Sequence, residues 1–123
     1  MANILVVDDE PSLLQLVIMI LKQNGHTVLS ASSGVEALML YSSYRSEVHL
    51  VLTDVQMPGM DGVELARRLR ALNPSVKIVL MSGFVPDDIE LPKDLQLLTK
   101  PFPPNRLVAV VDQTLAAETY RGS

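Results

Sequence analysis

Acidic, hydroxyl and ammonium side chains stand directly after four short apolar runs of this 123-residue chain. Asp8 and Asp9 follow the first run, Asp54 follows a later one, and Ser82 and Lys100 follow the last two. Because the runs themselves are almost free of charge, composition alone does not explain this clustering. If the runs are strands of one parallel sheet, the five side chains meet at its carboxyl edge, where such sheets place their sites.

Three neighbouring carboxylates repel one another, and at least one takes up a proton unless a cation lies among them. The chain has no cysteine, and neither histidine ends a predicted strand, so the ligands are hard oxygens that favour Mg²⁺ or Mn²⁺ over zinc. Such an ion keeps positions open for a phosphate oxygen, beside the positive charge of Lys100 and the hydroxyl of Ser82. The set predicts a phosphoryl group carried by a carboxylate, with Asp54, on the central strand, as the nucleophile.

Apolar runs typical of buried strands alternate with segments of helical periodicity. The predicted strands are Ile4–Val7, His26–Ala31, Val48–Thr53, Val76–Met81 and Leu95–Thr99. The predicted helices are Pro11–Asn24, Val35–Ser43, Val63–Leu72 and Pro104–Thr119. The alternation predicts an α/β fold, a doubly wound parallel sheet covered on both faces, with residues 1–123 as a single domain. Residues 84–94 break the rhythm, because Pro86 and Pro92 leave room for one or two helical turns at most.

Local signals support the helix ends. Ser33 with Glu36 forms a predicted capping box, and Asp61 is a predicted N-cap. Gly25 is the predicted stop of the first helix. His26 and His49 lack metal-ligand spacing, so packing or surface roles are expected for both.

Composition excludes several classes of protein. With 48% hydrophobic and 20% charged residues, the chain is not intrinsically disordered. A net charge of −4 with no basic run argues against direct binding to nucleic acid. The most apolar stretch, Leu13–Leu21, is far shorter than the roughly 20 residues that cross a bilayer, so no membrane partner is expected.

Four segments together resemble the receiver domain of bacterial two-component response regulators, over essentially the whole chain. They are Ile4-Leu-Val-Val-Asp-Asp-Glu10, Leu52-Thr-Asp-Val-Gln-Met-Pro-Gly-Met-Asp-Gly62, Val79-Leu-Met-Ser-Gly83 and Leu98-Thr-Lys-Pro-Phe102. The resemblance implies a flavodoxin-like five-stranded sheet in the order 2-1-3-4-5, here with a short or missing fourth helix. It also implies a cytoplasmic signalling module, not an enzyme in the usual sense.

The resemblance assigns roles to the clustered residues. Asp54 is similar to the family's phosphoacceptor, and Asp9 and Asp54 to its Mg²⁺ ligands, with the backbone carbonyl of Gln56 as a third ligand and Asp8 acting through water. Lys100 is similar to the residue that pairs with the phosphoryl group, and Ser82 to the switch hydroxyl. A cis peptide between Lys100 and Pro101 is also expected by resemblance.

Two departures from the family pattern stand out. Leu97 occupies the position of the family's switch aromatic, so the usual coupling of hydroxyl to ring is absent. The curtailed segment after Met81-Ser-Gly-Phe84 resembles receivers attached to hybrid histidine kinases. It also argues against dimerisation through the face that the fourth helix, fifth strand and fifth helix form in the family, so a monomer is expected.

The first helix is apolar on more than one face. Its surplus could be a docking surface for a histidine kinase or a histidine phosphotransfer protein, as in the family, or only a wide core-facing stripe.

Three other functions compete with this interpretation. A Mg²⁺-dependent aspartyl phosphatase would carry Asp-x-Asp after its first strand, whereas Asp8 and Asp9 are adjacent. A flavin-binding module would offer hydroxyls and amides to a phosphate in its first loop, which is acidic here. A pseudo-receiver, which binds partners without being phosphorylated, would not need the complete set of acids, hydroxyl and lysine.

Overall fold

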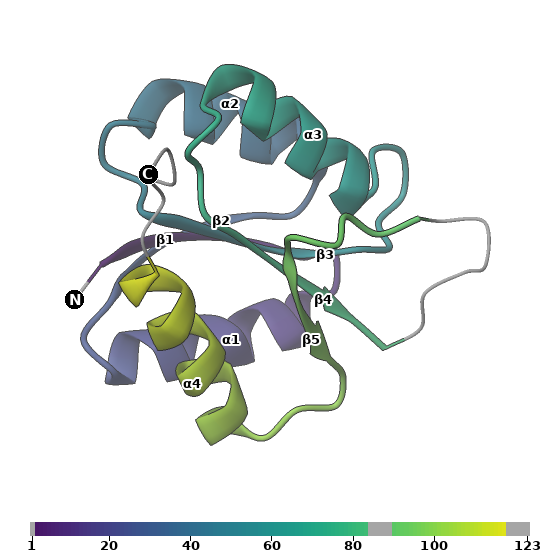
Figure 1. The fold of residues 1–123 in the computed structure, drawn as a ribbon. Coiled ribbons are helices and arrows are strands. Elements are labelled where there is room, and N and C mark those ends of the chain that lie inside the picture. Colours follow the sequence, from purple (N-terminus) through teal and green to yellow (C-terminus); the bar gives the residue numbers. More distant parts are fainter. Residues whose placement is uncertain (1, 84–89, 118–123) are drawn as a thin grey trace.

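A computed structural model describes residues 2–83 and 90–117 of the chain. Its centre is an all-parallel five-stranded sheet in the order β2-β1-β3-β4-β5 (Figure 1), which confirms the predicted topology. The strands are β1 (Asn3–Val7), β2 (Thr27–Ala31), β3 (Leu50–Asp54), β4 (Ile78–Ser82) and β5 (Gln96–Thr99). All side chains of β3 and β4 are buried, as expected for central strands covered on both faces.

Helices cover both faces of this sheet. They are α1 (Pro11–Gln23), α2 (Gly34–Tyr44), α3 (Gly62–Leu72) and α4 (Pro104–Ala116). In Figure 1, α2 and α3 lie above the sheet, and α1 and α4 lie below it. Alternate residues of β3 therefore enter two separate cores: Val51 packs on the α2–α3 side, whereas Leu50 and Leu52 pack on the α1–α4 side.

Capping residues fix where the helices begin and end. Ser33 accepts a hydrogen bond from the Glu36 backbone N–H, and Asp61 accepts one from that of Glu64, as predicted. Helix α1 ends just before Gly25, which has the positive φ (88°) typical of a helix stop. Ser33 and Asp61 lie in loops that leave the carboxyl edge of the sheet, whereas Gly25 lies between α1 and the start of β2.

Most element boundaries agree with prediction to within two residues. Strands β3 and β4 begin two residues later than predicted and include Asp54 and Ser82 as their last residues. Helix α4 ends at Ala116, before the predicted end. The Lys100–Pro101 peptide is cis, as expected. Residues 84–89 of the segment predicted to hold a stunted helix lie outside the described residues, and the remainder of that segment, residues 90–94, contains no helix.

Candidate functional site

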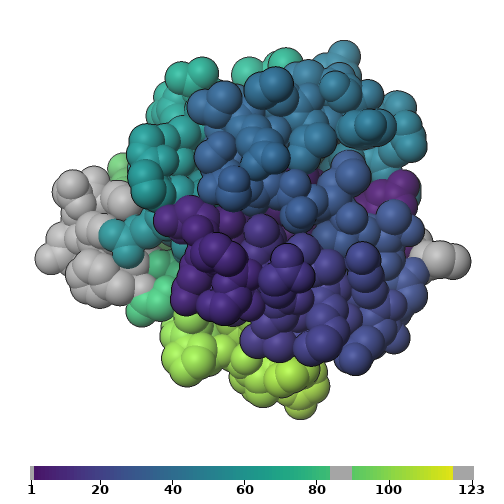
Figure 2. All heavy atoms as spheres, turned by 180° about the vertical axis from the view of Figure 1, so that it is seen from behind, coloured from purple at the N-terminus to yellow at the C-terminus, as the bar shows by residue number. Residues whose placement is uncertain are grey.

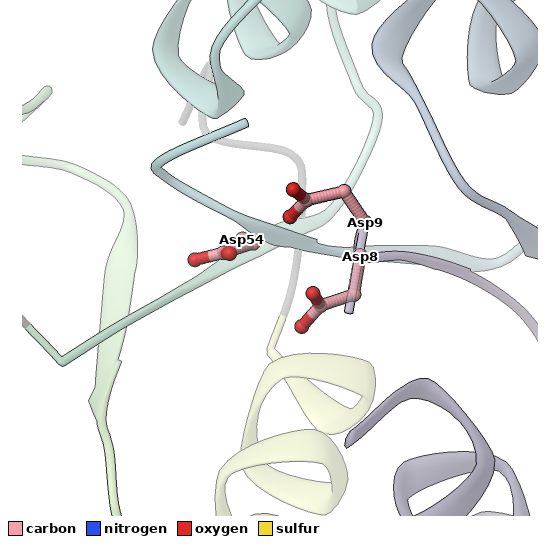
Figure 3. Close-up of side chains that lie close together, drawn as sticks. All are labelled: Asp8, Asp9 and Asp54. Atoms are coloured by element: carbon pink, nitrogen blue, oxygen red, sulfur yellow. The ribbon is translucent and has the colours of Figure 1, made fainter. Parts of the chain in front are cut away.

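Three carboxyl groups gather at the carboxyl ends of the first and third strands (Figure 3). Asp8 and Asp9 directly follow β1, and Asp54 is the last residue of β3, its neighbour in the sheet. One oxygen from each lies within 4.8 Å of the others. Asp8 and Asp54 are buried, whereas Asp9 is exposed to solvent. Because β1 and β3 are parallel neighbours and Val7 pairs with Thr53, the ends of the two strands bring these acids together, as the sequence predicted.

Lys100 lies beside the two buried carboxylates. Its Nζ is 3.3 Å from Oδ1 of Asp54 and 3.4 Å from Oδ2 of Asp8. The other Asp8 oxygen accepts a hydrogen bond from the backbone N–H of Glu10, at 2.9 Å. Lys100 directly follows β5. Its backbone N–H donates a hydrogen bond to the Ser82 carbonyl oxygen at the end of β4. One ammonium group therefore faces two of the three acids.

The pKa of Asp54 is shifted upward in this position. Burial raises its pKa above the usual value, and the nearby Asp8 charge adds to this effect. Lys100 opposes both through its charge and its hydrogen bond, and a backbone hydrogen bond from Gln56 also lowers the pKa. The net direction is upward, so one lysine does not fully compensate the buried anionic charge.

The donor set suits a hard divalent cation. The three clustered groups are all carboxylates, and they lie close enough to share one ion. Burial and the neighbouring Asp8 charge raise the pKa of Asp54, and a cation bound beside it would favour the ionised carboxylate. The residues present therefore fit a metal of the Mg²⁺ type.

The remaining predicted residues lie around this cluster. Ser82 is buried at the end of β4, one position beyond Met81, the register partner of Asp54. Gln56 follows β3 at the surface, within backbone reach of the Asp54 carboxylate. Leu97 is half-buried on β5 against the α2–α3 core. Sequence reasoning therefore identified side chains that the fold brings to one edge.

Two structural supports of the site were not predicted. Thr53 is fully buried, and its hydroxyl donates a hydrogen bond to the Asp54 carbonyl oxygen at 3.0 Å. The only signal for it was a hydroxyl residue inside an otherwise apolar strand. The second support is Gly62, where a Cβ would lie 2.1 Å from the same carbonyl oxygen. The close approach of Gly62 joins the start of α3 to the end of β3, which spacing along the chain does not predict.

Both histidines hold the start of β1. Nδ1 of His26 accepts the backbone N–H of Ala2, and Nδ1 of His49 accepts that of Asn3. These contacts lie at the amino ends of the strands, opposite the acidic cluster. They agree with the expected packing and surface roles.

The doubly wound sheet and its acidic edge define the class of protein as a flavodoxin-like α/β domain with a strand-end site. The family model of the response regulator receiver domain matches residues 4–112. The chain is 34% identical to the response regulator receiver protein CpdR of Brucella abortus, over 95% of this chain and 99% of that protein. The chain therefore belongs to the receiver domain family, whose members are signalling proteins rather than a family of catalytic enzymes.

Other relatives show the same domain in different settings. The chain is 38% identical to the sensor kinase CckA of Brucella abortus over 93% of this chain, but it spans only 12% of that protein. It spans 26% of the transcriptional regulatory protein GlrR of Escherichia coli, at 32% identity. Among solved structures, the receiver domain of the hybrid histidine kinase CckA superposes with a TM-score of 0.82 at 29% identity, covering 93% of this chain and 99% of that one. The sensor kinase CckA agrees with the prediction of a hybrid-kinase origin, whereas GlrR and CpdR are relatives of other kinds.

Across the residues that the structure describes, every helix is too short or too polar to cross a bilayer.

Proposed function

We propose that residues 1–123 form a single receiver domain of a two-component phosphorelay, which accepts a phosphoryl group on Asp54. One observation carries the proposal: three carboxylates lie within 4.8 Å of one another, with the Lys100 ammonium 3.3 Å from Asp54. The protein would work in the cytoplasm as a monomer. It would be phosphorylated once per signalling event, and it would catalyse its own phosphorylation and dephosphorylation.

Each side chain has a defined task in this proposal. An oxygen of the ionised Asp54 attacks phosphorus, a new O–P bond forms, and the bond from phosphorus to the donor's leaving group breaks. Lys100 stabilises the negative charge on the transferred group, and Ser82 donates a hydrogen bond to it after transfer. Asp9, Asp54 and the Gln56 carbonyl would hold Mg²⁺ or Mn²⁺, with Asp8 acting through water. The ion, when bound, supplies positive charge beside the phosphoryl oxygens.

The competing functions fit the geometry less well. The acidic loop that begins α1 would repel a flavin phosphate, and adjacent acids after β1 do not match the phosphatase pattern. A pseudo-receiver has the same fold and differs only in never being phosphorylated. The complete arrangement of Asp54, Lys100 and a buried Ser82 favours the phosphoacceptor.

Incubation with acetyl phosphate and Mg²⁺ tests the proposal. The wild-type chain is expected to gain the mass of one phosphoryl group, and Asp54→Asn is expected to abolish this gain completely. The matched control is Asp112→Asn, an exposed acid on α4, which is expected to retain it. Intact-protein mass spectrometry measures the result. A wild-type chain that gains no mass would favour the pseudo-receiver.

We propose that the phosphodonor, a histidine kinase or a histidine phosphotransfer protein, docks near α1. Leu16 and Met19 are 44% and 50% exposed on this helix, which lies above the yellow-green residues of α4 in the lower half of Figure 2. Leu16 also lines a groove of about 550 Å³ with Leu13, Phe102 and Lys100, beside the acidic cluster. Because this groove lies next to Lys100, a partner helix that carries phosphohistidine could bind in it and approach Asp54.

Leu16→Glu should slow phosphotransfer from the partner kinase about tenfold, because it puts a charge into an apolar contact. Phosphorylation by acetyl phosphate, which needs no docking, should stay at the wild-type rate. Met39→Glu, at a 66% exposed position on α2, is the matched control and should affect neither reaction. Equal rates of kinase-dependent transfer for wild type and Leu16→Glu would contradict docking at α1.

A further inference from the structure

The peptide group that follows the phosphoacceptor is held at both of its polar atoms. Its carbonyl oxygen, that of Asp54, accepts the Thr53 hydroxyl at 3.0 Å. Its N–H, that of Val55, donates to the Met81 carbonyl oxygen of β4 at 2.8 Å. A peptide group fixed at both ends has little freedom to rotate, and rotation here would turn the residues on either side of it.

Thr53 has no evident task in packing that an aliphatic residue could not perform. The side chain is fully buried in a strand whose preceding residues, Leu50 to Leu52, are all aliphatic. Burying a hydroxyl costs free energy unless it forms a hydrogen bond. Its partner is the carbonyl of Asp54, and the first residue of α3, Gly62, lies against the same oxygen. The hydroxyl therefore holds the last peptide group of β3, where the strand meets the loop of the site.

This peptide group lies between two groups that the proposed function uses. Before it stands the Asp54 side chain, and after it come Val55 and then Gln56, whose backbone N–H is near enough to the Asp54 carboxylate to lower its pKa. Turning the peptide would change the direction of the carboxylate and the position of Gln56 together. The Thr53 hydroxyl bonds to a backbone carbonyl and not to a carboxylate of the site, so its effect acts through Asp54.

We propose that Thr53 is a positioning residue for phosphorylation: its hydroxyl fixes the peptide after Asp54 and thereby presents the Asp54 carboxylate and the Gln56 backbone in one reactive arrangement. The inference rests on the proposed function and adds a residue to it. It requires the hydroxyl and not the methyl group of the side chain. Thr53→Val, which keeps the shape and removes the donor, should therefore be impaired, whereas Thr53→Ser should behave like wild type.

Thr114→Val is the matched control. The Thr114 hydroxyl also donates to a backbone carbonyl, that of Val110 at 2.8 Å, but within α4. At saturating Mg²⁺, Thr53→Val should be phosphorylated by acetyl phosphate about tenfold more slowly than wild type, and Thr114→Val at the wild-type rate. Thr53→Ser should restore the rate even though loss of its methyl group lowers the melting temperature. A wild-type rate for Thr53→Val, or equal losses for the valine and serine variants, would overturn the proposal.

Amide hydrogen exchange of Gln56, measured without phosphodonor, separates this proposal from the proposed function. Thr53→Val should speed exchange of the Gln56 N–H about fivefold, the size expected for one lost hydrogen bond, and Thr114→Val should leave it unchanged. Faster exchange in a chain that is never phosphorylated would reject the phosphoacceptor function and retain Thr53 as the residue that holds this peptide. Unchanged exchange in Thr53→Val would reject the role of Thr53, whatever the phosphorylation rate of the wild type.

Discussion

Lys100→Met should slow phosphorylation of Asp54 by acetyl phosphate about 100-fold. The Lys100 Nζ is 3.3 Å from the carboxylate that receives the phosphoryl group, so its charge faces the place where negative charge builds up during transfer. Loss of one such electrostatic partner typically costs two to three orders of magnitude. Methionine keeps an unbranched side chain and removes the ammonium group with its charge and its hydrogen-bond donors, so packing should change little. The rate of phosphoprotein formation, followed by mass spectrometry at saturating Mg²⁺, measures the effect.

The same variant should bind Mg²⁺ more tightly than wild type. Lys100 and the metal both interact with Asp8 and Asp54, and two cations near one another repel. Isothermal titration calorimetry measures this affinity. Opposite directions in the two measurements would show that Lys100 acts on the phosphoryl group rather than by holding the metal site together. Slower phosphorylation together with weaker Mg²⁺ binding would contradict this assignment and indicate collapse of the site.

Lys77→Met is the control for both measurements. Its Nζ donates to the Leu115 carbonyl oxygen, and its backbone pairs with the start of β3, at the other end of the sheet. It should lose a hydrogen bond and some stability, yet retain the wild-type phosphorylation rate and Mg²⁺ affinity. A slow Lys77→Met would mean that lost stability alone explains the effect at Lys100.

Gly62→Ala should lower the free energy of unfolding by about 3 kcal/mol, the upper end of the cost of small-to-large changes in a packed site. The added Cβ would lie 2.1 Å from the Asp54 carbonyl oxygen and 2.9 Å from Cα of Val55, both backbone atoms that cannot rotate away. Because the Gly62 N–H also donates to the Val55 carbonyl, at 2.8 Å, the helix start cannot shift without losing that bond. Urea unfolding measures the change, and a variant that fails to fold agrees with the prediction.

Gly83→Ala is the matched control for this substitution. Among the described residues, a Cβ at Gly83 would meet only the Cβ of Lys100, at an ordinary contact distance of 3.6 Å, although this glycine also lies at the carboxyl edge of the sheet. Its stability should stay within about 1 kcal/mol of wild type, as is usual away from tightly packed positions. Equal stabilities for the two alanine variants would show that the start of α3 can move, and that the close approach to Asp54 is not required.

The amino-acid sequence by itself determined the fold class and the composition of the site. Alternation of apolar runs with helical periodicity is a local pattern, and it predicted the sheet, its helices and the capping residues Ser33 and Asp61. The acids and the lysine were recognisable because each follows an apolar run, and parallel strands bring their carboxyl ends to one edge. Recognition of the receiver family added the strand order and the roles of the individual residues.

Only the tertiary structure decided how far each group is buried and what supports it. The raised pKa of Asp54 depends on burial and on Asp8, which lies 46 positions away in the sequence. The contact of Gly62 with the Asp54 carbonyl depends on how the loop after β3 returns to the strand. The Thr53 hydrogen bond depends on the direction of one hydroxyl in a closed core. Distances and solvation of this kind arise when segments pack in three dimensions, and spacing along the chain does not encode them in readable form.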